Sequence, residues 1–312
     1  TVIEGQIVEE GNVAIGAKVF SDIIRKLPSE QVEISVNENY QLFIKCGKAK
    51  FNIAAKPTDE FPYLPQIVKE KHVEISQFTL KDIIRQTVFS ISDNENTKVM
   101  TGELFEITAN KLKVVSLDGH RISIRNVELN NSYDNISVII PGKTLIEINK
   151  ILNGGVDDIV KIYFTDKHIL FEFESTVVLS RLIEGEYYKI DKMLSSDYET
   201  KITVNKKEML DSIDRTTLLM KEAEKKPVII DIKDNSMGLA MNSSIGSMDE
   251  EIDAVKEGKD ILIGFNPRFL IDALRVIDDE EITLYMINPK APCFIRDKDE
   301  SYIYLILPVN FN

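Results

Sequence analysis

The sequence KVFSDIIR at residues 18–25 returns as KTLIEINK at residues 143–150 and as RFLIDALR at residues 268–275. The copies begin 125 residues apart, and each has a basic, an acidic and a basic residue at positions i, i+4 and i+7. Those positions share one side of an α-helix, so each copy predicts an amphipathic helix with a charged stripe. Taken singly, each stripe also fits an ordinary solvated helix face with i,i+4 ion pairs. The fixed long interval, however, indicates repeated domains.

Smaller half-units of about sixty residues make up this repeat, each reading as a strand, a helix and then several strands. The first complete one predicts a strand, a helix and three strands at residues 13–15, 18–27, 32–36, 41–45 and 50–54. It starts near Asn12, and four similar half-units start near Val73, Ser137, Lys201 and Asp260. The pattern therefore predicts an α+β chain of repeated half-units.

Alternate half-units have helices of a second type. Leu80-x4-Arg85-x-Thr87 corresponds to Leu210-x4-Arg215-x-Thr217, 130 residues later, so a domain consists of two half-units. Because five half-units are an odd number, we interpret the strand-like run at residues 1–8 as the end of a missing first half-unit. The predicted domains are 1–70 (second half only), 71–197 and 198–312, with linkers at 57–71 and 195–200.

Composition restricts the classes of function. The 312 residues are 43% apolar, enough for two or three packed domains, and no apolar run is long enough to span a membrane. There is no secretory signal, and the two cysteines lie far apart, which favours a reducing cytoplasm. The net charge of −13 argues against nucleic acid as a partner unless the basic residues are gathered on one surface.

Signals for catalysis are weak. His72, His120 and His168 have no paired ligand spacing, the cysteines form no CxxC motif, and no glycine-rich phosphate loop is present. The sequence therefore predicts no metal site and no cofactor. Asp118 and His120 could form a base and its orienting group, so a cytosolic hydrolase built around them remains the alternative function.

Four stretches resemble one known family. They are DEFPYLP (59–65), DGHRI (118–122), SRLIEG (180–185) and YLILPV (304–309). Together they resemble the bacterial DNA polymerase III beta subunit, the sliding clamp, over the whole chain and in register with the repeats. The resemblance implies three tandem clamp-type domains in a head-to-tail homodimeric ring, with helices lining the central hole and sheets on the outside. It also implies a non-catalytic processivity factor for DNA replication.

The implied partner in the hole is double-stranded DNA, encircled without sequence readout. Basic residues of the repeated helices would contact its phosphates. The candidates are Lys18, Arg25, Arg85, Lys143, Lys150, Arg215, Arg268 and Arg275.

The resemblance further implies a groove between the second and third domains that accepts short peptides of the polymerase III alpha-type subunit, the clamp loader and other proteins. Its candidates in the second domain are Met100, Gly119, His120, Arg121, Ile122, Tyr188, Lys192 and Met193. Those in the third domain are Asn266, Phe269, Pro292, Leu305, Leu307, Pro308 and Val309. The residues Leu117, Tyr188 and Asn310 depart from common family residues, which leaves the preferred peptide open.

A subunit contact is expected between the first domain of one chain and the third domain of another. Its candidates are Lys50, Phe51, Ile53, Leu218 and Leu219. A third reading stays open beside the clamp and the hydrolase: a repeat protein that binds peptides without encircling DNA.

Overall fold

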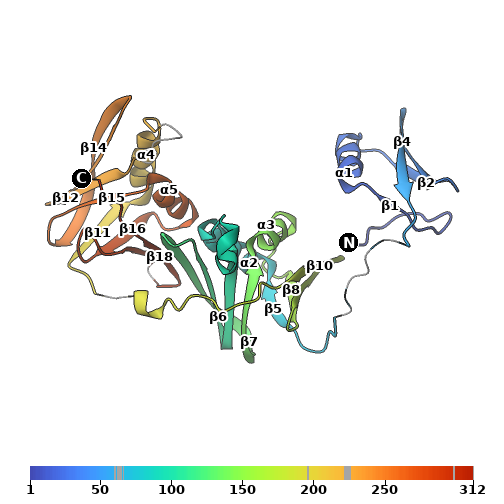
Figure 1. Cartoon of the computed structure of the whole chain (residues 1–312), viewed down its shortest axis with the longest axis horizontal. Helices are drawn as coiled ribbons and strands as arrows, with labels where there is room; N and C mark the ends of the chain where they lie inside the picture. The colour runs from blue at the N-terminus through green and yellow to red at the C-terminus, as the bar shows by residue number, and fades with distance from the viewer. Residues whose placement is uncertain are drawn as a thin grey trace. The chain divides into compact units, whose positions relative to one another are not determined.

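The computed structural model describes residues 1–59, 61, 65, 67–194, 197–220, 226–297 and 299–311. The chain forms two compact units, Thr1–Gln66 and Ile67–Asn312 (Figure 1). Both predicted linkers and the stretch 59–65 lie partly outside the described residues. Among the helices that the structure describes, none has the length and apolar character that a membrane span requires.

The first unit is a single half-unit of the predicted kind. Its elements are β1 (Ala14–Ile15), α1 (Ala17–Lys26), β2 (Val32–Val36), β3 (Gln41–Cys46) and β4 (Ala49–Lys56). The strands form one antiparallel sheet in the order β1-β4-β3-β2, and the predicted bounds agree within two residues. The strand expected at residues 1–8 is wrong, because these residues have no partner strand among those described and form no regular element.

Burial in the first unit alternates along β3. Leu42, Ile44 and Cys46 are buried, whereas Phe43 between them is 40% exposed. This period of two gives the sheet one apolar face. Helix α1 buries no residue fully, and β2 is exposed along its whole length.

The second unit contains the other four half-units. Its first half has β5 (Val73–Ser76), α2 (Gln77–Thr87), η1 (Val88–Ser90), η2 (Glu95–Thr101), β6 (Gly102–Leu117), β7 (Arg121–Pro141), α3 (Gly142–Ile151), β8 (Ile159–Phe164), β9 (His168–Phe173), β10 (Thr176–Arg181) and η3 (Asp191–Met193). Its second half has β11 (Thr200–Asn205), α4 (Lys206–Thr217), β12 (Val228–Lys233), β13 (Ser236–Ser243), β14 (Gly246–Gly258), β15 (Ile261–Phe265), α5 (Pro267–Val276), β16 (Glu281–Met286), β17 (Cys293–Arg296) and β18 (Tyr302–Ile306).

Two sheets hold these strands together. One has the order β10-β9-β8-β5, and the other runs β15-β12-β13-β14-β11-β16-β17-β18-β7-β6. In the larger sheet β18 pairs antiparallel with β7, with Tyr302 opposite Arg125 and Ile306 opposite Arg121. Main-chain hydrogen bonds therefore cross the junction between the predicted second and third domains.

Each predicted domain of this unit has its own core. Leu80 and Ile83 of α2 and Leu145 and Ile148 of α3 are fully buried, as the helical spacing predicts. A smaller third cluster joins Leu117 and Ile122 to Phe294 and Leu305, so apolar packing also crosses the junction.

The helices of the second unit lie together. Helix α2 packs against α3, and α4 packs against α5. In Figure 1 the helices α4, α5, α2 and α3 follow one another along the upper side of this unit, and most of the strands lie below or to the left of them. Ser76, Asn205 and Asn266 cap α2, α4 and α5 by accepting hydrogen bonds from first-turn N–H groups, so each helix begins directly after its strand.

Candidate functional site

The turn between β6 and β7 is fixed by one carboxylate. Asp118 Oδ1 accepts hydrogen bonds from the N–H groups of His120 (2.9 Å) and Arg121 (3.2 Å), and Oδ2 accepts one from Arg121 Nε (2.9 Å). Gly119 has φ +89°, which glycine adopts more easily than other residues. The Asp118 carboxylate is thus committed to the turn, and no described hydrogen bond joins it to the His120 imidazole. A hydrolase site built on this pair is not supported.

Strand β18 brings the third domain against this turn. Leu305 lies opposite Ile122, and the N–H of Leu307 donates to His120 O at 2.8 Å. The His120 ring stacks on Phe269 of α5 with 6.2 Å between centroids. The structure thus brings Gly119–Ile122 together with Phe269, Leu305 and Leu307.

Some of the other groove candidates form exposed apolar surface. Tyr188, Met193, Leu307 and Val309 are 48%, 57%, 37% and 38% exposed, whereas Leu305 is only 3% exposed. Leu305 is mainly a packing residue of the junction cluster, and Met100 packs against the same cluster.

The remaining groove candidates lie at several places. Asn266 caps α5 by accepting from Arg268 N (3.1 Å), and the N–H of Val309 donates to Gly264 O (2.8 Å). Lys192 lies in η3, Pro308 follows β18, and Pro292 lies between β16 and β17. Among the described contacts, none joins Pro292 to the turn.

Arg121 has a different environment from its neighbours. Its side chain is 9% exposed, and its Nη1 and Nη2 donate to Asp272 Oδ2 of α5 and to Phe89 O of η1, each at 2.7 Å. The guanidinium carbon lies 4.2 Å from the Phe269 ring centroid and 5.4 Å from that of Phe89. Burial lowers the pKa of Arg121, but Tyr304, Asp272 and Asp118 raise it above its usual value, so the side chain stays charged.

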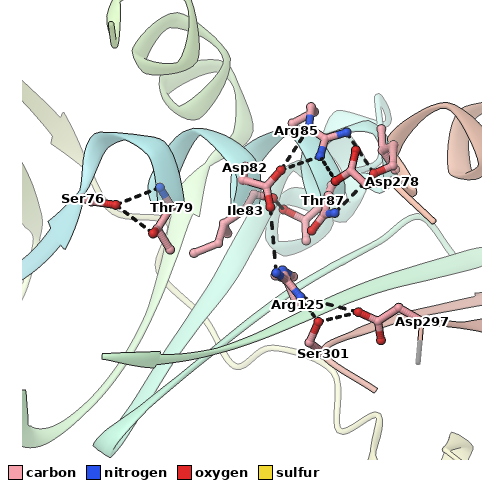
Figure 2. Close-up of polar contacts among 12 residues, drawn as sticks. Ser76, Thr79, Asp82, Ile83, Arg85, Thr87, Arg125, Asp278, Asp297 and Ser301 are labelled. Carbon is pink, nitrogen blue, oxygen red and sulfur yellow. Dashed lines mark hydrogen bonds and ion pairs between the residues drawn. The ribbon is translucent and has the colours of Figure 1, made fainter. Parts of the chain in front are cut away.

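A second polar network crosses the same junction (Figure 2). Arg85 of α2 donates to Asp278 Oδ2 (2.7 Å), to Val276 O (2.9 Å) and, through Nε, to Asp82 Oδ1 (3.1 Å). Arg125 lies between Asp82 (3.9 Å) and Asp297 (3.8 Å) and donates to Ser301. Sequence reasoning missed this network, because its partners lie far apart in the chain and only Arg85 had a repeated position.

All eight candidate DNA contacts lie on helices, but they differ in how exposed they are and in whether an acidic side chain pairs with them. Lys143 is 91% exposed, with Glu95 at 3.5 Å. Lys150, Arg215 and Arg275 have closer or similar acidic partners in Glu147, Glu250 and Asp214. The structure describes no ion pair for Lys18, Arg25 or Arg268 within the residues it covers. Of the three expected i,i+4 pairs none is found among the described contacts, and Asp272 pairs with Arg121 instead of Arg268.

One cavity, of about 560 Å³, is lined by none of the turn residues 118–121. It lies between the outer face of β6 and β7 and the segment 182–191, and it includes Tyr188 but no other groove candidate. Tyr187, one of its lining residues, donates a hydrogen bond to Val115 O (3.2 Å). The β18–β7 contacts, rather than this cavity, bring groove candidates of the second and third domains together.

Among the described residues there is neither a cluster suited to a metal ion nor an exposed cysteine thiol. No cluster of three or more histidine, cysteine or acidic side chains suited to a metal ion occurs among the described residues. Cys46 and Cys293 are free and buried, and burial raises the pKa of the Cys293 thiol.

The comparisons with known proteins cover the whole length. Models of the DNA polymerase III beta subunit match residues 1–65 (N-terminal domain), 74–189 (central domain) and 191–310 (C-terminal domain). The chain is 35% identical to the beta sliding clamp of Staphylococcus aureus over 306 residues, which is 97% of this chain and 81% of that protein.

Solved structures agree with these matches. A putative DNA polymerase III beta subunit from Eubacterium rectale has 61% identity and a TM-score of 0.93, with 100% of this chain and 85% of that one covered. The DNA polymerase sliding clamp of Bacillus subtilis has 36% identity and a TM-score of 0.92, with 98% and 82% covered.

The fold is of the clamp type. It is built from repeated half-units whose helices carry basic residues, and one sheet continues across the junction between the second and third domains. The chain belongs to the DNA polymerase III beta subunit family. Its function is that of a DNA sliding clamp, a non-catalytic processivity factor in DNA replication. The domain boundaries stay predictions.

Proposed function

We propose that this clamp contacts duplex DNA through basic helix residues that are exposed and weakly paired with acidic residues. The eight candidates would therefore not contribute equally. Lys143 is a strong candidate because it is almost fully exposed, and Arg268 is another because it has, like Lys18 and Arg25, no described ion pair. Arg85 contributes least, since Asp82 and Asp278 neutralise it. Such contacts with phosphates carry no base readout and suit sliding.

Partner peptides would dock at the turn Gly119–Ile122 and the end of β18. The observation that carries this proposal is the hydrogen bond from Leu307 N to His120 O, which sets exposed Leu307 beside the turn. Tyr188 and Met193 would extend the apolar surface, and a flexible thioether adapts to different side chains. The polymerase III alpha-type subunit and the clamp loader are the partners we expect.

Two strand edges support a homodimer. Along Ala49–Ala54, β4 pairs only with β3 among the described strands, and along Gly246–Asp253, β14 pairs only with β13. Unpaired antiparallel edges of this kind can pair with each other in a second copy. Phe51 and Leu218 beside these edges are 38% and 77% exposed, and Leu219 lies near Gly246. A replication clamp of this kind would work in the bacterial cytoplasm.

Loading on nicked circular DNA tests the encircling mode. The chain should stay on the circle after a salt wash and leave when the circle is cut, because only a closed ring is held by topology. Retention on linear DNA would instead favour a protein that binds without encircling. Reversal of charge in Lys143→Glu and Arg268→Glu should weaken loading, and an unchanged loading rate at physiological salt would refute the proposed lining.

Peptide docking is tested separately. A fluorescent peptide with leucine and phenylalanine anchors should bind the chain, and Leu307→Asp should abolish binding without lowering the melting temperature. His120→Ala should weaken peptide docking. A hydrolase site at His120 would instead predict that the substitution abolishes catalytic turnover.

A further inference from the structure

The role of Arg121 goes beyond a groove contact. Its guanidinium is buried and donates hydrogen bonds to Asp118 in its own turn, to Phe89 O in η1 and to Asp272 in the third domain. It also lies over the Phe269 ring, on which the His120 ring stacks. Few of its donors remain for a docked peptide.

The three partners come from both sides of the junction. Asp118 and Phe89 belong to the second domain, whereas Asp272 and Phe269 belong to α5 in the third domain. Charge-assisted hydrogen bonds of 2.7–2.9 Å are directional, so they fix the turn relative to α5. In the proposed groove the turn and the end of β18 would form one wall, and Phe269 of α5 would form part of the other.

Asp272 is also the acidic residue of the stripe formed by Arg268, Asp272 and Arg275. Its side chain is 37% exposed, and its described ion pair is to Arg121 rather than to either arginine of its own helix. Arg121 therefore compensates, from the groove side, the negative charge in the middle of a helix proposed to face DNA.

We propose that Arg121 is a positioning residue with two effects: it holds the two walls of the peptide groove in register, and it neutralises Asp272 so that α5 presents a net positive face to DNA. The inference rests on the proposed groove and DNA lining. A single buried guanidinium then links the strength of peptide docking to the charge of the DNA-facing surface.

Four full-length variants separate the two effects: Arg121→Met, Asp272→Asn, their combination, and Asp278→Asn as a control. Asp278→Asn loosens the same junction by removing the partner of Arg85, but it leaves Arg121 intact. The first readout is the affinity of the fluorescent leucine- and phenylalanine-anchored peptide. The second is the amount of chain that loads on nicked circular DNA when loading itself is carried out over a salt series, which is called retention below. Thermal unfolding of each variant checks folding.

Arg121→Met and Asp272→Asn should each weaken peptide binding about tenfold or more, because either change removes the charge-assisted link across the junction. Asp278→Asn should change it less than about twofold, since the link between Arg121 and Asp272 remains. An equal loss in Asp278→Asn would show general loosening of the junction and overturn the positioning role.

DNA retention should respond differently. Arg121→Met leaves Asp272 uncompensated and should lower retention, whereas Asp272→Asn should keep or raise it. The double variant should recover retention but not peptide affinity. A double variant no better than Arg121→Met on DNA would overturn the charge effect. If the unmodified chain binds no peptide or is not retained on circular DNA, it is the proposed function that fails, so the two failures are distinguishable. Should Arg121→Met not fold, Asp272→Asn alone still tests the link.

Discussion

Arg85 provides a sharp test of how this clamp uses its helix cations. The repeat predicts a DNA contact, but the structure uses Arg85 at the domain junction, where it binds Asp278, Val276 O and Asp82. Replacement by methionine in Arg85→Met keeps an unbranched, mainly apolar stem and removes the guanidinium with its charge. The comparison is Lys143→Met, which removes one helix cation that is 91% exposed.

The expected loss of stability follows from the contacts. A charge-assisted hydrogen bond contributes about 1.5–3 kcal/mol when shielded, but the Arg85 side chain is 35% exposed and that of Asp278 is 74% exposed. Arg85→Met should therefore destabilise the chain by about 1–2 kcal/mol after discounting for solvent. For a unit of this size that corresponds to a fall in melting temperature of about 3–6 °C. Lys143→Met should change it by less than about 1 °C.

DNA binding should show the opposite order. Lys143→Met should reduce the slope of log retention against log salt by about one counterion, because a free phosphate contact is lost. Arg85→Met should change the slope less, since two carboxylates already neutralise that charge. Differential scanning calorimetry and the salt series on nicked circular DNA measure both quantities. An unchanged melting temperature together with a large loss of slope in Arg85→Met would refute this reasoning.

Three further predictions concern the core, the groove and the subunit contact. Burial raises the pKa of Glu103 well above its usual value of 4.5. The protonated Glu103 side chain therefore contributes its full stability below pH 4.5, and this contribution is lost as the pH rises above that value, by up to about 1.4 kcal/mol per pH unit. Glu103→Gln should remove this part of the pH dependence in urea titrations, and an identical pH slope in both proteins would contradict it. Leu305→Ala should destabilise the chain by about 2–5 kcal/mol because the side chain is 3% exposed, whereas Leu307→Ala at 37% exposure should mainly weaken peptide binding. Calorimetry measures the stability and fluorescence anisotropy the peptide affinity, and a larger loss of stability in Leu307→Ala than in Leu305→Ala would contradict this prediction. Leu218→Asp should convert dimer to monomer in sedimentation equilibrium while Val156→Asp, at a similarly exposed apolar position in a loop, should not; a dimer that survives Leu218→Asp argues against that contact.

Local periodicity predicted the elements well. The helix at 17–26 and its following strands agree closely with the sequence pattern, because apolar spacing alone decides which face of each element is buried. The run at 1–8 misled the same reasoning. Its valine and isoleucine residues favour a strand, but a strand also needs a partner, and β propensity does not supply one. The turn at Asp118 was predicted as part of a site, yet its carboxylate serves the turn itself.

Equivalent positions of the repeat have different uses because their neighbours differ. Asp22, Glu147 and Asp272 occupy the same place in their stripes, but Glu147 pairs with Lys150 on its own helix and Asp272 pairs with Arg121, which is 151 residues away. A pattern of i, i+4 and i+7 reports only which side of a helix a residue occupies. Which partner neutralises it depends on the strand that packs against that helix, and here the β18–β7 pairing brings Arg121 to α5. The charge of α5, a helix that we propose faces DNA, therefore depends partly on the contact between Asp272 and Arg121 at the domain junction, and sequence repeats alone could not reveal that dependence.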